Sequence, residues 1–314
     1  MRSLPGEQIA KKRKNDAQQE FFGGPWTQQK LECLEKYLRA YTKIFRVNPR
    51  AQFLRTTYVD AFAGTGYIQV GIPELPLAQV MPELADLRSE IQAQADEYKK
   101  GSVVRALELE PPFHRYLFIE RDVGRYVELC RLTERFPDRK GRIEVVNADA
   151  NEYLLKWCHA RDWRRNRAVV FLDPFGMQVD WALIESIAAT KAIDLWLLFP
   201  LFAANRLLVT KGKPPENWAT RLTRILGTDR WEDEFYRTEK SLLIQGEERT
   251  IKVADIKKIG EFFVDRLRSV FTAVAEPLTL TNTRGTPLFL FCFAAGNPRG
   301  APTAVGIAKD IIGG

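Results

Sequence analysis

The stretch Asp60-Ala61-Phe62-Ala63-Gly64-Thr65-Gly66 decides the fold, because it places a glycine turn directly after a short apolar strand at residues 56–61. Glycine lets a backbone turn sharply and approach a ligand without a Cβ clash. The turn lacks the Gly-Lys-[Ser/Thr] ending of a P-loop, and only Gly64 and Gly66 fit the G-x-G-x-x-G spacing of dinucleotide-binding folds. These departures disfavour a pyrophosphate cofactor.

Four further apolar strands follow this turn and are separated by segments of helical character. We expect them at residues 116–119, 143–146, 168–172 and 194–199. Strands that are apolar throughout and alternate with helices indicate a parallel sheet buried on both faces. The pattern predicts an α/β fold, Rossmann-like and doubly wound, which an antiparallel hairpin at residues 274–280 and 288–294 would close.

The chain is expected to form one domain over residues 25–314, preceded by a flexible basic tail at residues 1–24. A first amphipathic helix should begin near Thr27, which can cap it, and end before Asn48-Pro49. Two stretches are too long for ordinary connections and are interpreted as insertions, at about residues 71–112 and 201–258. Both are expected to be helical.

Four successive strands end in an acidic residue, namely Asp60, Glu120, Asp149 and Asp173. In an open α/β sheet, ligands bind beyond the carboxyl ends of the strands, and an acidic residue after the second strand accepts ribose hydroxyls. Glu120 fits that role. Asp149 could accept an adenine amine, and Asp60 could hold an ammonium directly or through water. Each carboxylate alone has a simpler alternative as a helix cap.

The stretch Asp173-Pro174-Phe175-Gly176 is the candidate for chemistry. Proline and glycine leave backbone carbonyls exposed beside the carboxylate, and these acceptors can bind a target NH or NH2 group. Phe175 could stack on a planar substrate. In the alternative interpretation, Phe175 belongs to the core and Asp173 caps the next helix.

The composition of the chain argues against a metal site, a membrane span and a signal peptide. The four cysteines (Cys33, Cys130, Cys158, Cys292) are dispersed and only two histidines occur, so no metal site is expected. No apolar run is long enough to span a bilayer and no signal peptide is evident, so we expect a cytoplasmic protein that does not enter a membrane.

The formal net charge of +7 suits a nucleic acid or another acidic partner. Basic residues concentrate at residues 11–14, 161–167 and 211–213, and Trp157 and Trp163 near the second group could stack on bases. The alternative is that these runs are simply a solvated surface.

Taken in order, residues 60–66, Phe118-Ile119-Glu120-Arg121, Asn147-Ala148-Asp149 and Phe171-Leu172-Asp173-Pro174-Phe175-Gly176 resemble class I S-adenosylmethionine-dependent methyltransferases. More narrowly, the chain resembles the three-Cys-motif partner (TcmP) family over residues 25–200. The resemblance implies a mostly parallel seven-stranded sheet with a reversed last strand. It also implies that S-adenosylmethionine is bound by Asp60, Ala61, Phe62, Ala63, Gly64, Thr65, Gly66, Glu120, Arg121, Asp149 and Ala150.

The family name refers to a separate partner protein with three cysteines, of the phage-related Gp37/Gp68-like type, and it suggests a bacterial source. The leading hypothesis is methyl transfer to a nitrogen on a nucleic acid or on a partner-bound substrate, with Asp173, Pro174 and Phe175 at the site of transfer. The stretch Asp173-Pro174-Phe175 departs from the Asp-Pro-Pro-[Tyr/Phe] pattern of amino-methyltransferases. The rival hypothesis is a non-catalytic S-adenosylmethionine-binding module that docks the three-cysteine protein.

Overall fold

The computed structural model describes residues 25–67, 100–240 and 248–314. The predicted basic tail and most of the predicted insertion at residues 71–112 therefore lie outside the described residues. At the centre is a sheet whose strands are β1 (Arg55–Asp60), β2 (Arg115–Ile119), β3 (Ile143–Val146), β4 (Asn166–Leu172), β5 (Ile193–Phe199), β8 (Ala273–Val274), β9 (Leu278–Thr281) and β10 (Pro287–Ala295).

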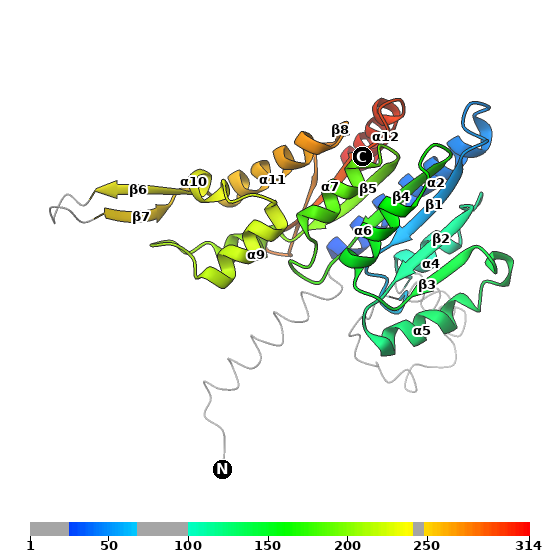
Figure 1. Cartoon of the computed structure of the whole chain (residues 1–314), viewed down its shortest axis with the longest axis horizontal. Coiled ribbons are helices and arrows are strands. Elements are labelled where there is room, and N and C mark those ends of the chain that lie inside the picture. Colours follow the sequence, from blue (N-terminus) through cyan, green and yellow to red (C-terminus); the bar gives the residue numbers. More distant parts are fainter. Residues whose placement is uncertain (1–24, 68–99, 241–247) are drawn as a thin grey trace, which may run out of the picture.

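The strand order is β3-β2-β1-β4-β5-β10-β8, and β9 pairs with the remaining part of β10 (Figure 1). Neighbouring strands from β3 to β5 run parallel, whereas β10 runs antiparallel to β5, β8 and β9. The parallel sheet, the reversed strand and the closing hairpin are therefore confirmed. Because β1 to β5 point the same way, all five strand ends, and with them the acidic residues, lie at one edge.

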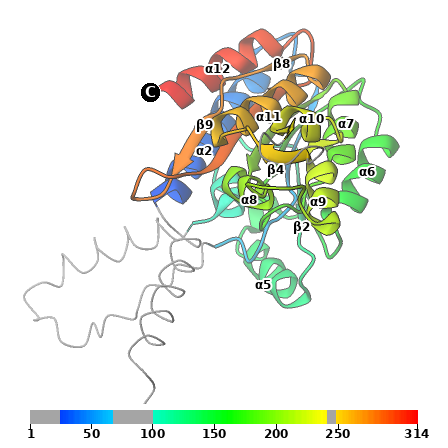
Figure 2. The same cartoon turned by 90° about the vertical axis from the view of Figure 1, so that its left-hand side faces the viewer.

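Both faces of the central strands β2, β4, β5 and β10 are buried, which explains their long apolar runs. Tyr58 and Phe171 point into one core, and their neighbours Val59 and Val170 point into the other. Helices α2 (Pro25–Val47), α4 (Ser102–Leu107), α5 (Val123–Thr133) and α12 (Ala301–Gly313) cover the first face. The second face is covered by α6 (Ala150–Ala160), α7 (Trp181–Ala189), α8 (Leu201–Leu207), α9 (Glu216–Leu226), α10 (Trp231–Phe235) and α11 (Ile256–Val270). Figure 2 shows α6 and α7 on the side opposite α2 and α12.

The prediction for the first helix is right about its end and wrong about its cap. Helix α2 begins at Pro25, two residues before Thr27, and the Thr27 side chain is buried. Thr27 therefore lies inside the first turn, where its hydroxyl is not at the position of an N-cap. The helix ends at Val47, immediately before Asn48-Pro49 as expected.

The predicted insertion at residues 201–258 is helical only in part. It contains α8, α9 and α10, followed by an antiparallel hairpin of β6 (Tyr236–Lys240) and β7 (Glu248–Lys252) that extends away from the body (Figure 1). Tyr236, at the start of β6, is buried, but residues 237–239 are all exposed, so β6 beyond its first residue has no buried face. Without alternating apolar and polar positions, the sequence carries no period-two signal that would identify these strands.

Helix α2 is tied to the sheet by a buried polar contact. The Tyr37 hydroxyl donates to Oδ2 of Asp194 on β5 at 2.8 Å. Burial raises the pKa of Asp194 to about 7, although the hydrogen bond from Tyr37 opposes the shift. The folded protein thus holds a proton that an unfolded aspartate releases near pH 4.

We therefore expect the free energy of unfolding to fall as pH rises from about 4 to 7, because the unfolded chain binds fewer protons than the folded one. The Asp194→Asn variant should lose less stability than wild type between pH 5 and pH 7.5, by up to about 1.4 kcal/mol per pH unit. Urea unfolding at both pH values measures this difference. The exposed Asp233→Asn variant serves as the control, and equal pH dependence in all three proteins would contradict the assignment.

Candidate functional site

The glycine turn after β1 is clamped between the ends of its two neighbouring strands. The Ala61 amide donates to the Phe171 carbonyl of β4, and the Ala63 amide donates to the Ile119 carbonyl of β2. Gly64 and Gly66 have φ values of +59° and +80°, a region in which other residues are strained. The turn is therefore a fixed part of the carboxyl edge.

Asp60 lies beneath this turn and is fully buried. Its carboxylate accepts hydrogen bonds from the Ser102 hydroxyl and, at 3.3 Å, from the Phe62 amide. Burial raises the pKa of Asp60 to about 7, the Ser102 hydrogen bond lowers it, and the nearby Asp173 carboxylate raises it further. Asp60 thus supports the turn from within, and in the part of the chain that the structure describes it is not among the residues that line the two cavities beside the turn.

Glu120 connects the end of β2 to the turn. Its Oε2 accepts the Gly64 amide at 3.0 Å, and its Oε1 accepts the Asp122 amide at 2.8 Å. The guanidinium of Arg125, on the first turn of α5, also donates to Oε1, with Nη2 at 3.0 Å. The carboxylate is only 5% exposed, so it is a buried anion held by several donors.

Asp149 and Ala150, the predicted residues that follow β3, lie at the start of α6. Asp149 caps α6 by accepting the Asn151 amide at 3.0 Å and the Glu152 amide at 3.3 Å. Its other oxygen lies 3.7 Å from Nη1 of the exposed Arg121. The helix-cap alternative therefore holds for Asp149, and the carboxylate remains partly accessible.

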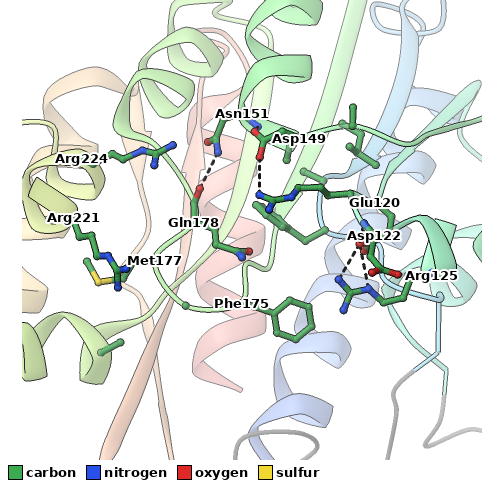
Figure 3. Close-up of a pocket in the computed structure, with 18 of the residues that line it drawn as sticks. Glu120, Asp122, Arg125, Asp149, Asn151, Phe175, Met177, Gln178, Arg221 and Arg224 are labelled. Carbon is green, nitrogen blue, oxygen red and sulfur yellow. Dashed lines mark hydrogen bonds and ion pairs between the residues drawn. The ribbon is translucent and has the colours of Figure 1, made fainter. Parts of the chain in front are cut away.

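These residues surround a first cavity of about 990 Å³ at the carboxyl edge. Its lining includes the predicted residues Ala61, Phe62, Glu120, Arg121, Asp149 and Ala150. Figure 3 shows Arg221 and Arg224 of α9 across the cavity from Glu120 and Arg125, with Phe175 between them. The segment 201–258 therefore forms one wall of this cavity, and that wall is basic.

The stretch Asp173-Pro174-Phe175-Gly176 separates the first cavity from a second one of about 650 Å³. Phe175 is 50% exposed and stands 5.4 Å from the Arg125 guanidinium carbon, so its ring is not part of the core. Asp173 forms an ion pair with Lys30 of α2, whose side chain is buried. The second cavity is lined by Trp26, Thr27, Lys30, Leu31, residues 62–67, Gly101, Ser102, Arg125, residues 173–176, Leu198 and Phe289.

The structure therefore brings the predicted residues other than Asp60 to two adjoining cavities that share Phe62, Arg125, Phe175 and Gly176. Lys30 and Arg125 were missed by the sequence-based reasoning. Lys30 lies four residues before Leu34 and seven before Tyr37, on the buried stripe of α2. A lysine at such a position signals a buried charge that needs a partner, and this signal could have identified it.

The cysteines carry no sign of a nucleophile or metal site in the part of the chain that the structure describes. They lie apart, and burial raises the pKa of the Cys158 thiol to about 12. Within residues 25–67, 100–240 and 248–314, no three metal-binding side chains converge. Across the same ranges, none of the helices combines the length and apolar character needed to cross a bilayer.

Comparison with known proteins supports the fold. No family model and no curated protein sequence matches the chain. The crystal structure of protein LPL1258 from Legionella pneumophila, of the DUF519 family, is 12% identical with a TM-score of 0.50, over 92% of this chain and 91% of that one. An S-adenosylmethionine-dependent methyltransferase from Clostridium acetobutylicum is 9% identical with a TM-score of 0.31, over 83% and 92% of the two chains.

At 12% identity, the similarity to LPL1258 concerns the fold alone. Together with the observed strand order and the reversed β10, it confirms the predicted Rossmann-like, mostly parallel α/β architecture. The narrower resemblance to the three-Cys-motif partner family stays a prediction.

The two glycines of the turn should differ in what they tolerate. A Cβ on Gly66 would lie 2.2 Å from Cδ2 of the buried Leu132, whereas a Cβ on Gly64 meets nothing within 4 Å. Gly64→Ala should cost about 1–2 kcal/mol of unfolding free energy from its positive φ alone. Gly66→Ala should cost a further ~1–3 kcal/mol from overpacking. Urea unfolding of both variants tests this order, and a smaller loss for Gly66→Ala would contradict it.

Proposed function

We propose that this protein binds S-adenosylmethionine across the carboxyl ends of β1, β2 and β3 and transfers its methyl group to a nitrogen of a nucleic acid or of a partner-bound substrate. The observation that carries the proposal is the buried Glu120 carboxylate, which joins the glycine turn to the mouth of the first cavity. An acidic group at this position in the fold suits an unphosphorylated ribose.

The first cavity suits the adenosine part of the ligand. A carboxylate has about four acceptor positions, and Arg125 occupies the Oε1 side of Glu120 with two donors. Arg125 is half-exposed on α5, so its side chain can swing aside and leave Oε1 to ribose hydroxyls. The partly accessible Asp149 carboxylate, beyond Glu120, suits the exocyclic amine of adenine.

The second cavity suits the amino-acid end of the ligand, which carries a carboxylate and an ammonium. Lys30 supplies the cation for the carboxylate, and Asp173 is the anion already paired with it. When the ligand carboxylate engages Lys30, the Asp173 carboxylate becomes available to accept an N–H of the methyl acceptor. This exchange predicts that S-adenosylmethionine binds before the acceptor.

When bound, S-adenosylmethionine would supply a methyl group on a positively charged sulfur, and an in-line nitrogen lone pair could form a bond to the methyl carbon as the carbon–sulfur bond breaks and the sulfur leaves as a neutral thioether. The residues of this chain then act mainly by positioning, because holding two reactants in near-attack geometry removes much of the barrier. Asp173 orients the acceptor nitrogen, and the exposed ring of Phe175 stacks on a planar acceptor. The nitrogen can release its proton to water afterwards, so Asp173 needs no general-base role.

The basic wall of the first cavity favours an acidic acceptor. Arg221 and Arg224 of α9 face the cavity together with Arg121 and Arg125. Arg224 is paired with Asp180, whereas Arg221 is exposed and makes no ion pair within the described residues. Such a wall would attract the phosphates of a nucleic acid.

The second candidate is a non-catalytic S-adenosylmethionine-binding module that docks a three-cysteine, Gp37/Gp68-like protein. The observation in its favour is the β6–β7 hairpin, which extends from the body of the molecule as a docking element could (Figure 1). Both candidates share the ligand and differ in whether the methyl group is transferred.

Methyl transfer can be measured with the full chain, tritium-labelled S-adenosylmethionine and mixed-sequence RNA and DNA oligonucleotides as acceptors. Wild type should transfer label, and Asp173→Asn should lower kcat at least about 100-fold because the acceptor nitrogen is no longer oriented. The exposed Glu276→Gln variant is the control. Unchanged turnover in Asp173→Asn would overturn the role of Asp173, and ligand binding without any transfer would favour the docking module.

A further inference from the structure

The edge of the sheet opposite the candidate site carries a row of arginines. Strands β1 and β2 begin with Arg55 and Arg115, and Arg142 and Arg165 each stand one residue before β3 and β4. Because these four strands are parallel neighbours in the order β3-β2-β1-β4, all four arginines lie at the edge where the strands begin. In Figure 1 this is the end near the blue loop that joins α2 to β1.

The four side chains, which we call the arginine edge, are exposed and not neutralised. None of them forms an ion pair with a carboxylate in the described part of the chain. Among the acids near this edge, Glu110 pairs with Arg139, Asp162 pairs with Arg164, and Glu144 of β3 accepts a hydrogen bond from the Tyr153 hydroxyl at 2.9 Å. The edge therefore presents net positive charge to solvent.

Two titratable groups at this edge respond to that charge. The pKa of His114 is lowered by partial burial and then by the positive charges of Arg142, Arg55 and Arg46. The pKa of Arg161 is lowered by burial and then by Arg115. Burial is the larger cause of both shifts, and the smaller contributions from arginines show that Arg55, Arg115 and Arg142 lie close enough to act on these groups.

A third cavity, of about 590 Å³, opens beside the arginine edge between α2, β4, β5 and the start of α12. Its wall includes Phe53, which is 64% exposed, and Arg167. Nη1 of Arg167 donates to the carbonyls of Trp163 and Asn166, while its buried Nε has no hydrogen-bond partner among the described residues. An aromatic ring and an unsatisfied guanidinium donor thus lie together at this end of the molecule.

We propose that the arginine edge binds the phosphate backbone of a single-stranded nucleic acid, with a base received by the cavity beside Phe53. Guanidinium groups bind phosphate with paired donors, and exposed aromatic rings stack on unpaired bases. Adjacent strands lie about 4.8 Å apart, so four strand starts span about 15 Å, enough to face several phosphates.

This surface deepens the proposed function and rests on it in taking the methyl acceptor to be a nucleic acid. Strand β4 has seven residues, so the arginine edge is about 20 Å from the strand ends at which transfer would occur. The edge therefore anchors a segment of nucleic acid remote from the acceptor nitrogen. Binding there and binding of S-adenosylmethionine can be measured separately.

The test is a salt titration of binding to a fluorescently labelled single-stranded RNA of mixed sequence. The variant Arg55→Gln/Arg115→Gln/Arg165→Gln should bind at least about tenfold more weakly than wild type at low salt. The slope of log K against log salt should become shallower by about 2, because three phosphate contacts are lost. The matched control Arg230→Gln/Lys257→Gln/Arg268→Gln removes the same charge from exposed positions elsewhere and should change the slope little.

A variant with lysine at all three edge positions should keep most of the slope, which separates a loss of charge from a folding defect. An unchanged slope in the edge variant, or an equal change in both glutamine variants, would overturn the proposal. S-adenosylmethionine affinity should be the same in all of these proteins. If wild type transfers no methyl group but the edge variant still binds RNA more weakly and with a shallower salt dependence, only the proposed function is contradicted.

Discussion

The burial of both faces of the central sheet is the constraint on which the other features depend. Strands β1 to β5 are parallel and joined by crossovers whose helices cover both faces of the sheet, and parallel strands place all of their carboxyl ends at one edge. That edge collects Asp60, Glu120, Asp149 and Asp173 from four separate strands. The same geometry places the strand beginnings, with their arginines, at the opposite edge. The two surfaces with functional proposals thus arise from one packing requirement.

Glu120 connects the glycine turn at the end of β1 to the cavity proposed to bind the ligand. The carboxylate holds the Gly64 amide on one side and Arg125 on the other, so the positions of the turn, α5 and the first cavity are coupled through a single buried anion. The Lys30–Asp173 pair has a similar part in the second cavity, where it joins α2 to the end of β4. A ligand that carries hydroxyls at one end and a carboxylate at the other would match Glu120 and Lys30, and the cavities meet at Phe62 and Phe175.

Much of this arrangement could be predicted from the sequence, because the strands that form it are continuous apolar runs ending in acidic residues. Other features were beyond local patterns. Beyond the buried Tyr236, strand β6 of the hairpin is exposed and shows no apolar periodicity. Helix α2 begins before Thr27, so the presence of a residue that can cap a helix did not identify its first residue. The burial of Asp60 follows from α4, which brings Ser102 over it from 42 residues away. The Lys30–Asp173 pair spans 143 residues, a separation at which sequence spacing carries no information.

The most direct test of the central claim is calorimetric titration of the full chain with S-adenosylmethionine, for wild type, Glu120→Gln and the control Glu128→Gln on the exposed side of α5. Loss of a charge-assisted hydrogen bond to ribose should weaken binding at least about tenfold in Glu120→Gln. Wild type and Glu128→Gln should bind one molecule per chain with the same affinity. Absence of binding by wild type, or equal affinity in all three proteins, would contradict the assignment of the carboxyl edge as a S-adenosylmethionine site.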